Sequence, residues 1–340
     1  MSHFFNGLLD VDMKRVAIIG AGLSGLTLGH LLQDVAQITL FDKGRSPGGR
    51  LAYRRAHPYV FDHGVQFFRA KTEAFQKFLD PWVRSGVIQP WCSRFVEINQ
   101  GILDHGHDWS ELLPHYVGVP HMNAFPRALA KGLDIRLGTR IIEVQSMSSQ
   151  WALYDDSGAE CGLYDWIVYA MPVAQVIDLM NHSSRLFKQL EGRQMKPCDA
   201  LMLGFEAPLV LPFDAALIKG APISWISMNQ TKPERSSACS MVVHSTNQWA
   251  LEHAKFSNSE VIKILKQAAS EVVGSIWEQP VYEDLQRWRY ANIAPQKGQQ
   301  ALLDLEERVA ICGDWLIQGR VEAAFQSASY LADQLIQQWA

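Results

Sequence analysis

A glycine-rich turn near the start of the chain has the spacing needed to bind the phosphates of a dinucleotide. Residues 20–25 (GAGLSG) follow a short apolar run and open a segment with helical spacing. Gly20 permits a tight turn, Gly22 lets the backbone approach a pyrophosphate, and Gly25 allows close packing of helix on strand. The helix N-terminus would offer free N–H groups and a partial positive charge to the phosphates. Asp42 follows roughly 20 residues later, where an acid can bind ribose hydroxyls.

Two further elements favour FAD over NAD as the dinucleotide. Residues 44–50 (GRSPGGR) contain glycines that let the backbone approach a ligand, and Arg50 offers a charge-assisted fork to phosphate. Far along the chain, Gly313-Asp314 ends an apolar run, and a helix is predicted to start near Val321. An acid at a strand end can bind ribityl hydroxyls, and a helix N-terminus can stabilise the negative charge of a reduced flavin. An NAD dehydrogenase does not need this distant element.

These residues require strands and helices that hold them in place. Residues 14–19 and 37–41 are predicted as buried parallel strands, joined by a helix over 23–33 with a right-handed crossover. Residues 308–312 form another buried strand, and a long helix covers 320–339. Further helices are predicted at 72–85, 123–131 and 259–273, and further strands at 135–137, 141–144, 151–154, 166–169, 201–205, 224–228 and 240–245. The stretch 86–121 is predicted to be irregular.

The 340 residues, of which 48% are hydrophobic and 19% charged, predict two domains of ordinary size. We expect a discontinuous α/β, Rossmann-like FAD-binding domain and a substrate domain with a mixed sheet inserted into it. The first comprises residues 13–75, 122–178 and 286–340, and the second comprises residues 76–121 and 179–285. Residues 1–12 lack the pattern of a secretory signal, so we expect a flexible leader.

Five sequence blocks together resemble the renalase-like family, which includes the bacterial renalases and lies within the wider flavin amine oxidase superfamily. The blocks are GAGLSG (20–25), FDKGRSPGGR (41–50), FDHGVQFF (61–68), WRYA (288–291) and CGDWxxxGRVEAA (312–324). The resemblance implies a p-hydroxybenzoate-hydroxylase-like two-domain fold with non-covalent FAD between the domains. The FAD contacts that we expect are Gly20, Ala21, Gly22, Leu23, Ser24, Gly25, Asp42, Lys43, Gly49, Arg50, Gln66, Ile142, Gly313, Asp314, Val321, Glu322 and Ala323.

The resemblance to the bacterial members also implies an activity. It is the oxidation of the 2- and 6-dihydro isomers of NAD(P)H to NAD(P)+, by hydride transfer to flavin N5 and reoxidation by O2 to H2O2. The partners would be a dihydronicotinamide dinucleotide and O2. Hydride transfer needs the two rings held face to face, and it needs no acid, base or nucleophile from the protein. This agrees with the absence of a triad or paired-carboxylate signal in the sequence.

Candidate substrate residues come from several segments. Gln66 matches a position beside the isoalloxazine, and His244 and Asn229, at the ends of two predicted strands, match pocket positions of the renalase-like pattern. Flat walls for a ring could come from Trp225, Trp288 and Tyr290. A histidine that ends an apolar strand is as often structural, and the tryptophans are at least as often part of a core, so both interpretations stay open.

Two other functions remain open. One is oxidation of a small amine, although the amine oxidase branch has a lysine near flavin N5 and a flanking aromatic pair. Neither can be placed in this sequence, since residues 286–295 contain no lysine. The other, from a different class, is a non-catalytic flavin-binding sensor or scaffold.

Several classes of function are disfavoured. A net charge of −4 argues against nucleic-acid binding, and no apolar run is long enough to span a bilayer. Residues 104–108 (DHGHD) have no further ligands nearby, so a polar loop is expected there rather than a metal site, and a GxSxG hydrolase elbow is missing. The five dispersed cysteines indicate a reducing compartment, so we expect a cytoplasmic protein. Both a monomer and a dimer stay open.

Overall fold

A six-stranded sheet, parallel except for one edge strand, forms the centre of the predicted FAD-binding domain. The computed structural model describes residues 13–274 and 277–340, so the predicted leader at 1–12 lies outside the described residues. The sheet has the order β19-β20-β13-β1-β2-β9, and only β19 runs antiparallel. Its strands are β1 (Lys14–Ile19), β2 (Ala36–Asp42), β9 (Asp134–Leu137), β13 (Trp166–Tyr169), β19 (Ala301–Asp304) and β20 (Val309–Cys312).

Successive residues of these strands face two different layers. Val16 and Ile18 pack towards α1 (Leu23–Leu32) and α7 (Val321–Trp339), whereas Ala17 and Ile19 join a second core. Both faces are covered, which explains why the β1 sequence is apolar over its buried residues instead of alternating. Among the residues that the structure describes, no helix has the length and apolar character needed to cross a membrane.

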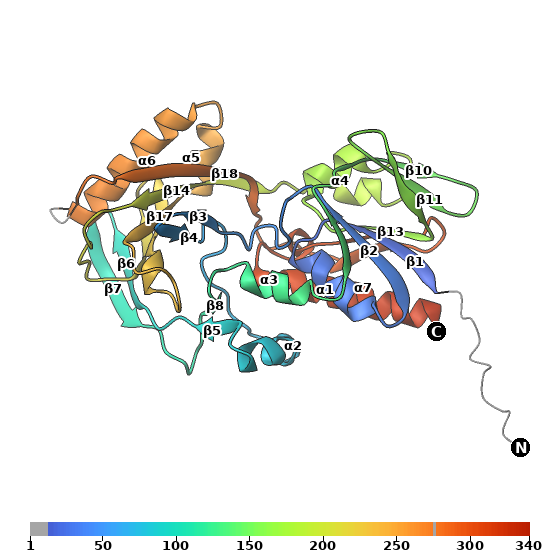
Figure 1. The fold of residues 1–340 in the computed structure, drawn as a ribbon. Coiled ribbons are helices and arrows are strands. Elements are labelled where there is room, and N and C mark those ends of the chain that lie inside the picture. Colours follow the sequence, from blue (N-terminus) through green and yellow to red (C-terminus); the bar gives the residue numbers. More distant parts are fainter. Residues whose placement is uncertain (1–12, 275–276) are drawn as a thin grey trace, which may run out of the picture.

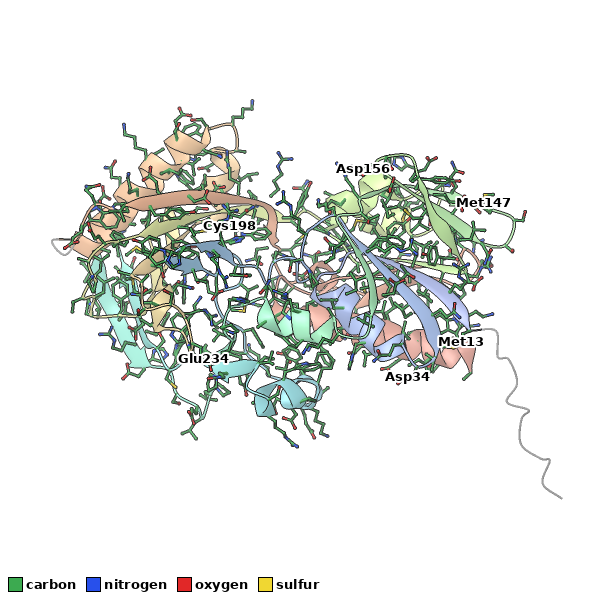
Figure 2. All side chains as sticks on the ribbon, in the orientation of Figure 1. Met13, Asp34, Met147, Asp156, Cys198 and Glu234 are labelled. Atoms are coloured by element: carbon green, nitrogen blue, oxygen red, sulfur yellow. The ribbon has the colours of Figure 1, made fainter. Side chains whose placement is uncertain are left out.

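The second core lies under a three-stranded antiparallel meander and the helix α4 (Val173–Leu179). The meander consists of β10 (Ile141–Ser146), β11 (Trp151–Asp155) and β12 (Glu160–Tyr164). Met147 and Asp156, labelled in Figure 2, mark the turns that follow β10 and β11. The sheet is therefore enclosed between helices on one face and the meander on the other.

A seven-stranded mixed sheet forms the second domain, which lies beside the first (Figure 1). The order is β18-β14-β17-β16-β15-β6-β7, and only the pair of β6 and β15 is parallel. The strands are β6 (Arg94–Asn99), β7 (Ile102–Asp108), β14 (Lys196–Gly204), β15 (Ala215–Lys219), β16 (Ile223–Met228), β17 (Ser240–Ser245) and β18 (Tyr282–Asn292). The predicted fold class, a Rossmann-like domain with a mixed-sheet partner, is confirmed.

The two faces of this second sheet differ in what covers them. The helices α5 (Asn247–Glu252) and α6 (Asn258–Val273) cover the outer face (Figure 1), and Ile226 and Val243 point into the core beneath them. Because side chains alternate along a strand, Trp225, Ser227 and His244 point to the opposite face. Strand alternation thus brings these three side chains to the inner face.

A hairpin from the N-terminal part of the chain packs on this inner face. Its strands are β3 (Arg54–Ala56) and β4 (Tyr59–Phe61), and Tyr59 and Phe61 share a buried cluster with Met202 and Val242. Strand β18 pairs with β14 up to Asn292. The sequence assigned residues 54–61 and 286–292 to the FAD-binding domain, but both segments pack with the substrate sheet, since their partners lie there.

Residues 86–121 are more regular than the sequence predicts. They contain β6 and β7 of the substrate sheet. They also contain β5 (Ile88–Pro90) and β8 (Tyr116–Gly118), which pair with each other in a separate two-stranded sheet. The predicted polar loop at 104–108 is part of the edge strand β7. Every residue of β7 is exposed, so no apolar alternation indicates a strand there. The helices α2 (Glu73–Arg84) and α3 (Ala124–Leu129) lie where the sequence predicts them.

The packing of the β3–β4 hairpin on the substrate sheet can be tested at Gly204. A Cβ atom there would lie 2.6 Å from Cε2 of Tyr59, which is buried on the sheet. We expect Gly204→Ala to lower the free energy of unfolding in urea by about 1–3 kcal/mol, because the ring must move out of a packed position. Gly106→Ala is the matched control, since its Cβ would be 3.5 Å from its nearest neighbour. Equal stability of the two variants would contradict the described packing.

Candidate FAD and substrate site

The carboxylate of Asp42 joins the glycine-rich turn to the loop that follows β2. Its Oδ2 accepts a hydrogen bond from the Ala21 N–H at 2.7 Å, and its Oδ1 accepts one from the Gly44 N–H at 2.7 Å. The Gly48 N–H donates to the Ala21 carbonyl at 2.8 Å. Segments 20–25 and 44–50 are therefore held side by side at the carboxyl end of β2, where α/β sheets bind their ligands.

Two helix N-termini in this region have N–H groups without a side-chain cap. Of the four longest helices, α2 and α6 are capped by the side chains of Thr72 and Ser257, whereas α1 and α7 have no side-chain cap. The first N–H groups of a helix need an external partner. A dinucleotide would provide anionic phosphates at α1 and the flavin edge at α7, so both helix ends fit the cofactor.

The glycines of the turn serve two different purposes. A Cβ atom on Gly25 would lie 2.0 Å from the Gly20 carbonyl oxygen, so Gly25 is needed for packing of the chain on itself. A Cβ atom on Gly22 would have nothing within 4 Å. The space beside Gly22 is therefore free of protein atoms among the described residues, as a turn that admits a pyrophosphate requires.

The two distant cofactor elements meet in an ion pair. The guanidinium of Arg50 donates to both carboxylate oxygens of Asp314, at 2.5 and 2.9 Å, and also to the Ala291 carbonyl at 3.0 Å. Asp314 is buried, at 5% exposure. Arg50 and Asp314 are 264 positions apart in sequence, and their contact brings together the N-terminal and C-terminal elements from which FAD was predicted.

The other predicted FAD contacts differ in how well they are placed. Gly49 and Gly313 lie in the two segments that meet here, and Val321 and Ala323 lie in the first turn of α7. Ile142 is 51% exposed and sits at an irregularity of β10. The Thr139 N–H donates to the Asp42 carbonyl at 3.0 Å, which keeps the start of β10 close to Asp42. Lys43 is exposed beside it.

The side chain of Glu322 bonds to the start of α2. Its carboxylate accepts hydrogen bonds from the Lys71 and Thr72 N–H groups at 3.0 and 2.7 Å, and from the Thr72 hydroxyl at 2.6 Å. Only the backbone of Glu322 remains for the cofactor. Its side chain instead anchors the start of α2 to the start of α7.

Gln66 lies in a segment that is bonded directly to the cofactor loop. The Val65 N–H donates to the Arg50 carbonyl at 2.9 Å. The Gln66 side chain is buried, and its Oε1 accepts from the Ser227 hydroxyl at 2.8 Å. Its Nε2 lies 3.4 Å from Nε2 of His244. The structure thus brings together Gln66 and His244, which the sequence selected independently.

His244 and Trp225 are neighbours on the inner face of the substrate sheet. They are paired in the register of β16 and β17. Burial lowers the pKa of His244 to about 4, so its imidazole is neutral at ordinary pH. The Trp225 ring lies 5.6 Å from the Phe67 ring and is 8% exposed. Trp225 is therefore mainly a core residue, which was one of the two roles that the sequence left open for it.

Trp288 and Tyr290 point to the same side of β18, because they are two residues apart. The Trp288 ring stacks on the His63 ring, with centroids 5.4 Å apart, and its Nε1–H donates to the His63 carbonyl at 3.0 Å. Both Trp288 and Tyr290 are partly exposed. Trp288 is therefore packed beside residues 63–64, and Tyr290 follows it on the same side of the strand.

Asn229 has a structural role. It is fully buried, its Oδ1 accepts from the Asp62 N–H at 3.3 Å, and its Nδ2 donates to the Val60 carbonyl at 2.8 Å. Both ends of the amide are therefore used to hold the backbone of residues 60–62. Asn229 positions the segment that carries Gln66, and its complete burial keeps its amide from contact with a substrate.

Sequence reasoning missed a buried charged cluster behind Gln66. Asp62, Lys232 and Arg235 have side chains that are at most 1% exposed, and Lys232 Nζ lies 3.2 Å from Gln66 Oε1. The lysine lies about 170 positions from Asp62 in sequence, within a turn that follows β16. Asp62 lies in the block of residues 61–68, in which the sequence selected Gln66. The spacing of residues along the chain does not link Asp62 to Lys232.

Comparisons with known proteins show the family of this chain. The model for flavin containing amine oxidoreductases matches residues 86–336, and that for an NAD(P)-binding Rossmann-like domain matches residues 18–82. Renalase of Mus musculus is 22% identical over 342 aligned positions, which cover 93% of this chain and 97% of that protein.

Two solved structures show the same fold. A protein of Exiguobacterium sp. 255-15, provisionally named a protoporphyrinogen oxidase, has a TM-score of 0.75 at 12% identity, covering 95% of this chain and 98% of that one. Putrescine oxidase bound to putrescine has a TM-score of 0.68 at 12% identity, covering 96% and 99%.

The Rossmann-like domain, the second domain with its mixed sheet and the matched family models define a FAD-dependent oxidoreductase. The chain belongs to the flavin-containing amine oxidoreductase family and is a renalase-like member of it. FAD is its cofactor.

The two glycine roles generate a prediction. We expect Gly22→Ala to leave the stability of the apoprotein unchanged and to raise the Kd for FAD at least tenfold, or about 1.4 kcal/mol. The added methyl has free space in the protein but would occupy the path of the pyrophosphate. Titration calorimetry with FAD measures the affinity. Gly25→Ala is the contrasting variant, since it should lower stability itself; unchanged FAD affinity in Gly22→Ala would contradict the proposed site.

The buried histidines predict a dependence of stability on pH. Burial lowers the pKa of His63 and of His244 to about 4, whereas an unfolded histidine titrates near about 6.5. The unfolded chain therefore binds more protons between these values. Stability should be complete above pH about 6.5 and fall as the pH is lowered to about 4. Urea denaturation across this range should show a shallower slope for His63→Gln than for wild type, whereas the exposed His57→Gln should match wild type.

Proposed function

We propose that this protein oxidises the 2- and 6-dihydro isomers of NAD(P)H to NAD(P)+. The observation that carries the proposal is the chemistry of the groups that converge beside the cofactor elements: the Gln66 amide, a neutral His244 imidazole, and the Trp288 indole. Such groups can orient a ring but are poorly suited to acid–base catalysis at neutral pH. Hydride transfer between two stacked rings needs only such orientation.

The partly exposed imidazole of His244 suits the carboxamide of a dihydronicotinamide, while the buried Gln66 amide, bonded to protein groups at both ends, holds the imidazole in place. In the structure, Gln66 Nε2 and His244 Nε2 lie 3.4 Å apart, and His244 is partly exposed. An imidazole without charge would also avoid repelling the nicotinamide cation that forms when hydride leaves. Bound FAD would accept the hydride and pass two electrons to O2, giving H2O2.

Aromatic side chains provide the flat part of the proposed site. Trp288 is fixed by its stack on His63 and by its hydrogen bond to the His63 carbonyl. Tyr290 lies on the same side of β18, closer to Ala291, whose carbonyl accepts from Arg50. A planar heterocycle between these rings and the flavin would be oriented without covalent help.

Oxidation of a small amine is the second candidate. The likeness to putrescine oxidase bound to putrescine favours it. So does Lys232, a buried lysine close to Gln66, because the amine oxidase branch has a lysine near the flavin. In this chain, however, the Lys232 side chain is fully buried, and two of its three N–H groups donate to Gln66 and Asp62. A non-catalytic flavin-binding sensor is the candidate from another class.

Anaerobic stopped-flow mixing distinguishes the candidates. We expect the 2- and 6-dihydro isomers, made by borohydride reduction of NAD+ or NADP+, to remove the visible absorbance of the bound oxidised flavin within seconds. Ordinary 4-dihydro NADH is the matched control and should react far more slowly. Admission of air should restore the absorbance and yield one H2O2 per isomer oxidised.

Each other outcome rejects the proposal in favour of a defined alternative. Reduction by putrescine or other amines but not by the isomers would establish amine oxidation. No reduction by either class, in protein with FAD bound, would favour the sensor. His244→Asn should give a graded loss of about 10- to 100-fold in the rate of reduction, as expected for a group that only positions the ring.

A further inference from the structure

Three charged side chains are buried together behind Gln66. The Asp62 carboxylate accepts from Lys232 Nζ at 3.2 Å, from Arg235 Nε and Nη2 at 3.2 and 2.7 Å, and from the Met122 N–H at 2.9 Å. Lys232 and Arg235 lie on either side of Glu234, which is labelled in Figure 2. The cluster contains two cations and one anion.

Lys232 is the surplus cation of this cluster. Arg235 already pairs with Asp62 through two nitrogens, so the lysine is not needed to neutralise the acid. Removing an ammonium group from water is costly, and replacing buried charges with apolar groups is often neutral or stabilising. The ammonium also lies 5.2 Å from the centre of the Trp91 ring. A further role is therefore needed to explain a lysine at this position.

The remaining hydrogen bond of Lys232 indicates that role. Its Nζ donates to Gln66 Oε1 at 3.2 Å, and the Ser227 hydroxyl donates to the same oxygen at 2.8 Å. Gln66 Nε2 faces the carbonyls of Asp62 and Gly64. An amide rotated by a half turn would place its NH2 group against two donors and its oxygen against two carbonyls. The orientation of the amide is therefore fixed.

The fixed amide determines where His244 carries its proton. An amide nitrogen cannot accept, so an Nε2–H on His244 would point at the NH2 group of Gln66, 3.4 Å away. The contact therefore favours His244 Nε2 as an acceptor, which shares a Gln66 N–H with the carbonyls of Asp62 and Gly64. A neutral imidazole that accepts at Nε2 carries its hydrogen on Nδ1. The order of contacts is thus Asp62, Lys232, Gln66 and then His244.

We propose that Lys232 is a positioning residue, whose ammonium group, held by Asp62, fixes the Gln66 amide and thereby the orientation and tautomer of His244 at the flavin. The proposal deepens the proposed function and rests on it for the importance of His244 in the reaction. The geometric part concerns only side chains of this chain and can be tested without turnover.

The direct test is the tautomer of His244 in the FAD-bound protein labelled with 15N-histidine. Long-range 1H–15N spectra distinguish Nδ1–H from Nε2–H, and His244→Asn assigns the signal. In wild type we expect the Nδ1–H form, and in Lys232→Met a mixture or the Nε2–H form. Lys219→Met, a half-exposed lysine paired with Glu97, is the matched control and should leave the signal unchanged.

Ser227→Ala keeps the test decisive if Lys232→Met fails to fold. It removes the other donor to Gln66 Oε1 and should shift the His244 signal in the same direction. An unchanged Nδ1–H signal in every folded variant of this pair would overturn the proposal, whatever the substrate proves to be. This outcome is distinct from failure of the proposed function, which would appear as unreduced flavin in wild type.

A double-mutant cycle tests the kinetic consequence. We expect Lys232→Met and Gln66→Ala each to slow flavin reduction by about 10- to 100-fold, with little change in the Kd of the isomer. If Lys232 acts through Gln66, the double variant should be about as slow as the slower single variant. Multiplication of the two losses would show independent action and reject the proposal.

Discussion

The cofactor site depends on the contacts of Arg50. Its guanidinium binds Asp314 and the Ala291 carbonyl, and its own carbonyl accepts from the Val65 N–H. One residue thus connects the cofactor loop, the C-terminal strand and the segment that carries Gln66. The Gly64 position shows how close this contact is, since a Cβ atom there would lie 2.0 Å from the Arg50 carbonyl oxygen. The bidentate pair is both directional and charge-assisted, which suits it to align two distant segments of the FAD-binding domain.

The substrate side of the molecule is organised by strand alternation and by buried polar groups. Alternation places Ser227 and His244 on the inner face of a sheet whose outer face is packed against α6. The inner face then has to hold a loop with several buried polar groups, and each must find a partner. Asn229 bonds the backbone of residues 60–62, while Lys232, paired with Asp62, donates to Gln66 Oε1. Gln66 and its neighbours on the inner face are therefore held by buried hydrogen bonds and ion pairs.

Much of the FAD-binding domain could be predicted from the sequence because its signals are local. Residues 20–25 combine three glycines in a fixed spacing with a short apolar strand before them, and Asp42 follows at the expected distance. The substrate domain was less predictable. Strand β7 is exposed along its whole length and so has no apolar pattern, and the boundary at residue 286 cuts a strand whose partner, β14, lies about 90 positions away. The spacing of residues along the chain does not reveal which distant strands pair.

The sequence by itself determined the class of cofactor and the residues at each end of the phosphate turn, because tight turns and helix starts depend on neighbouring residues. Only the tertiary structure decided how the distant side chains are used. It turned the Glu322 carboxylate away to anchor α2, gave Asn229 a purely structural role, and buried Lys232 against Asp62 and Gln66. The physical reason is that a buried polar group is defined by the partners that remove it from water, and those partners come from strands far apart in the chain.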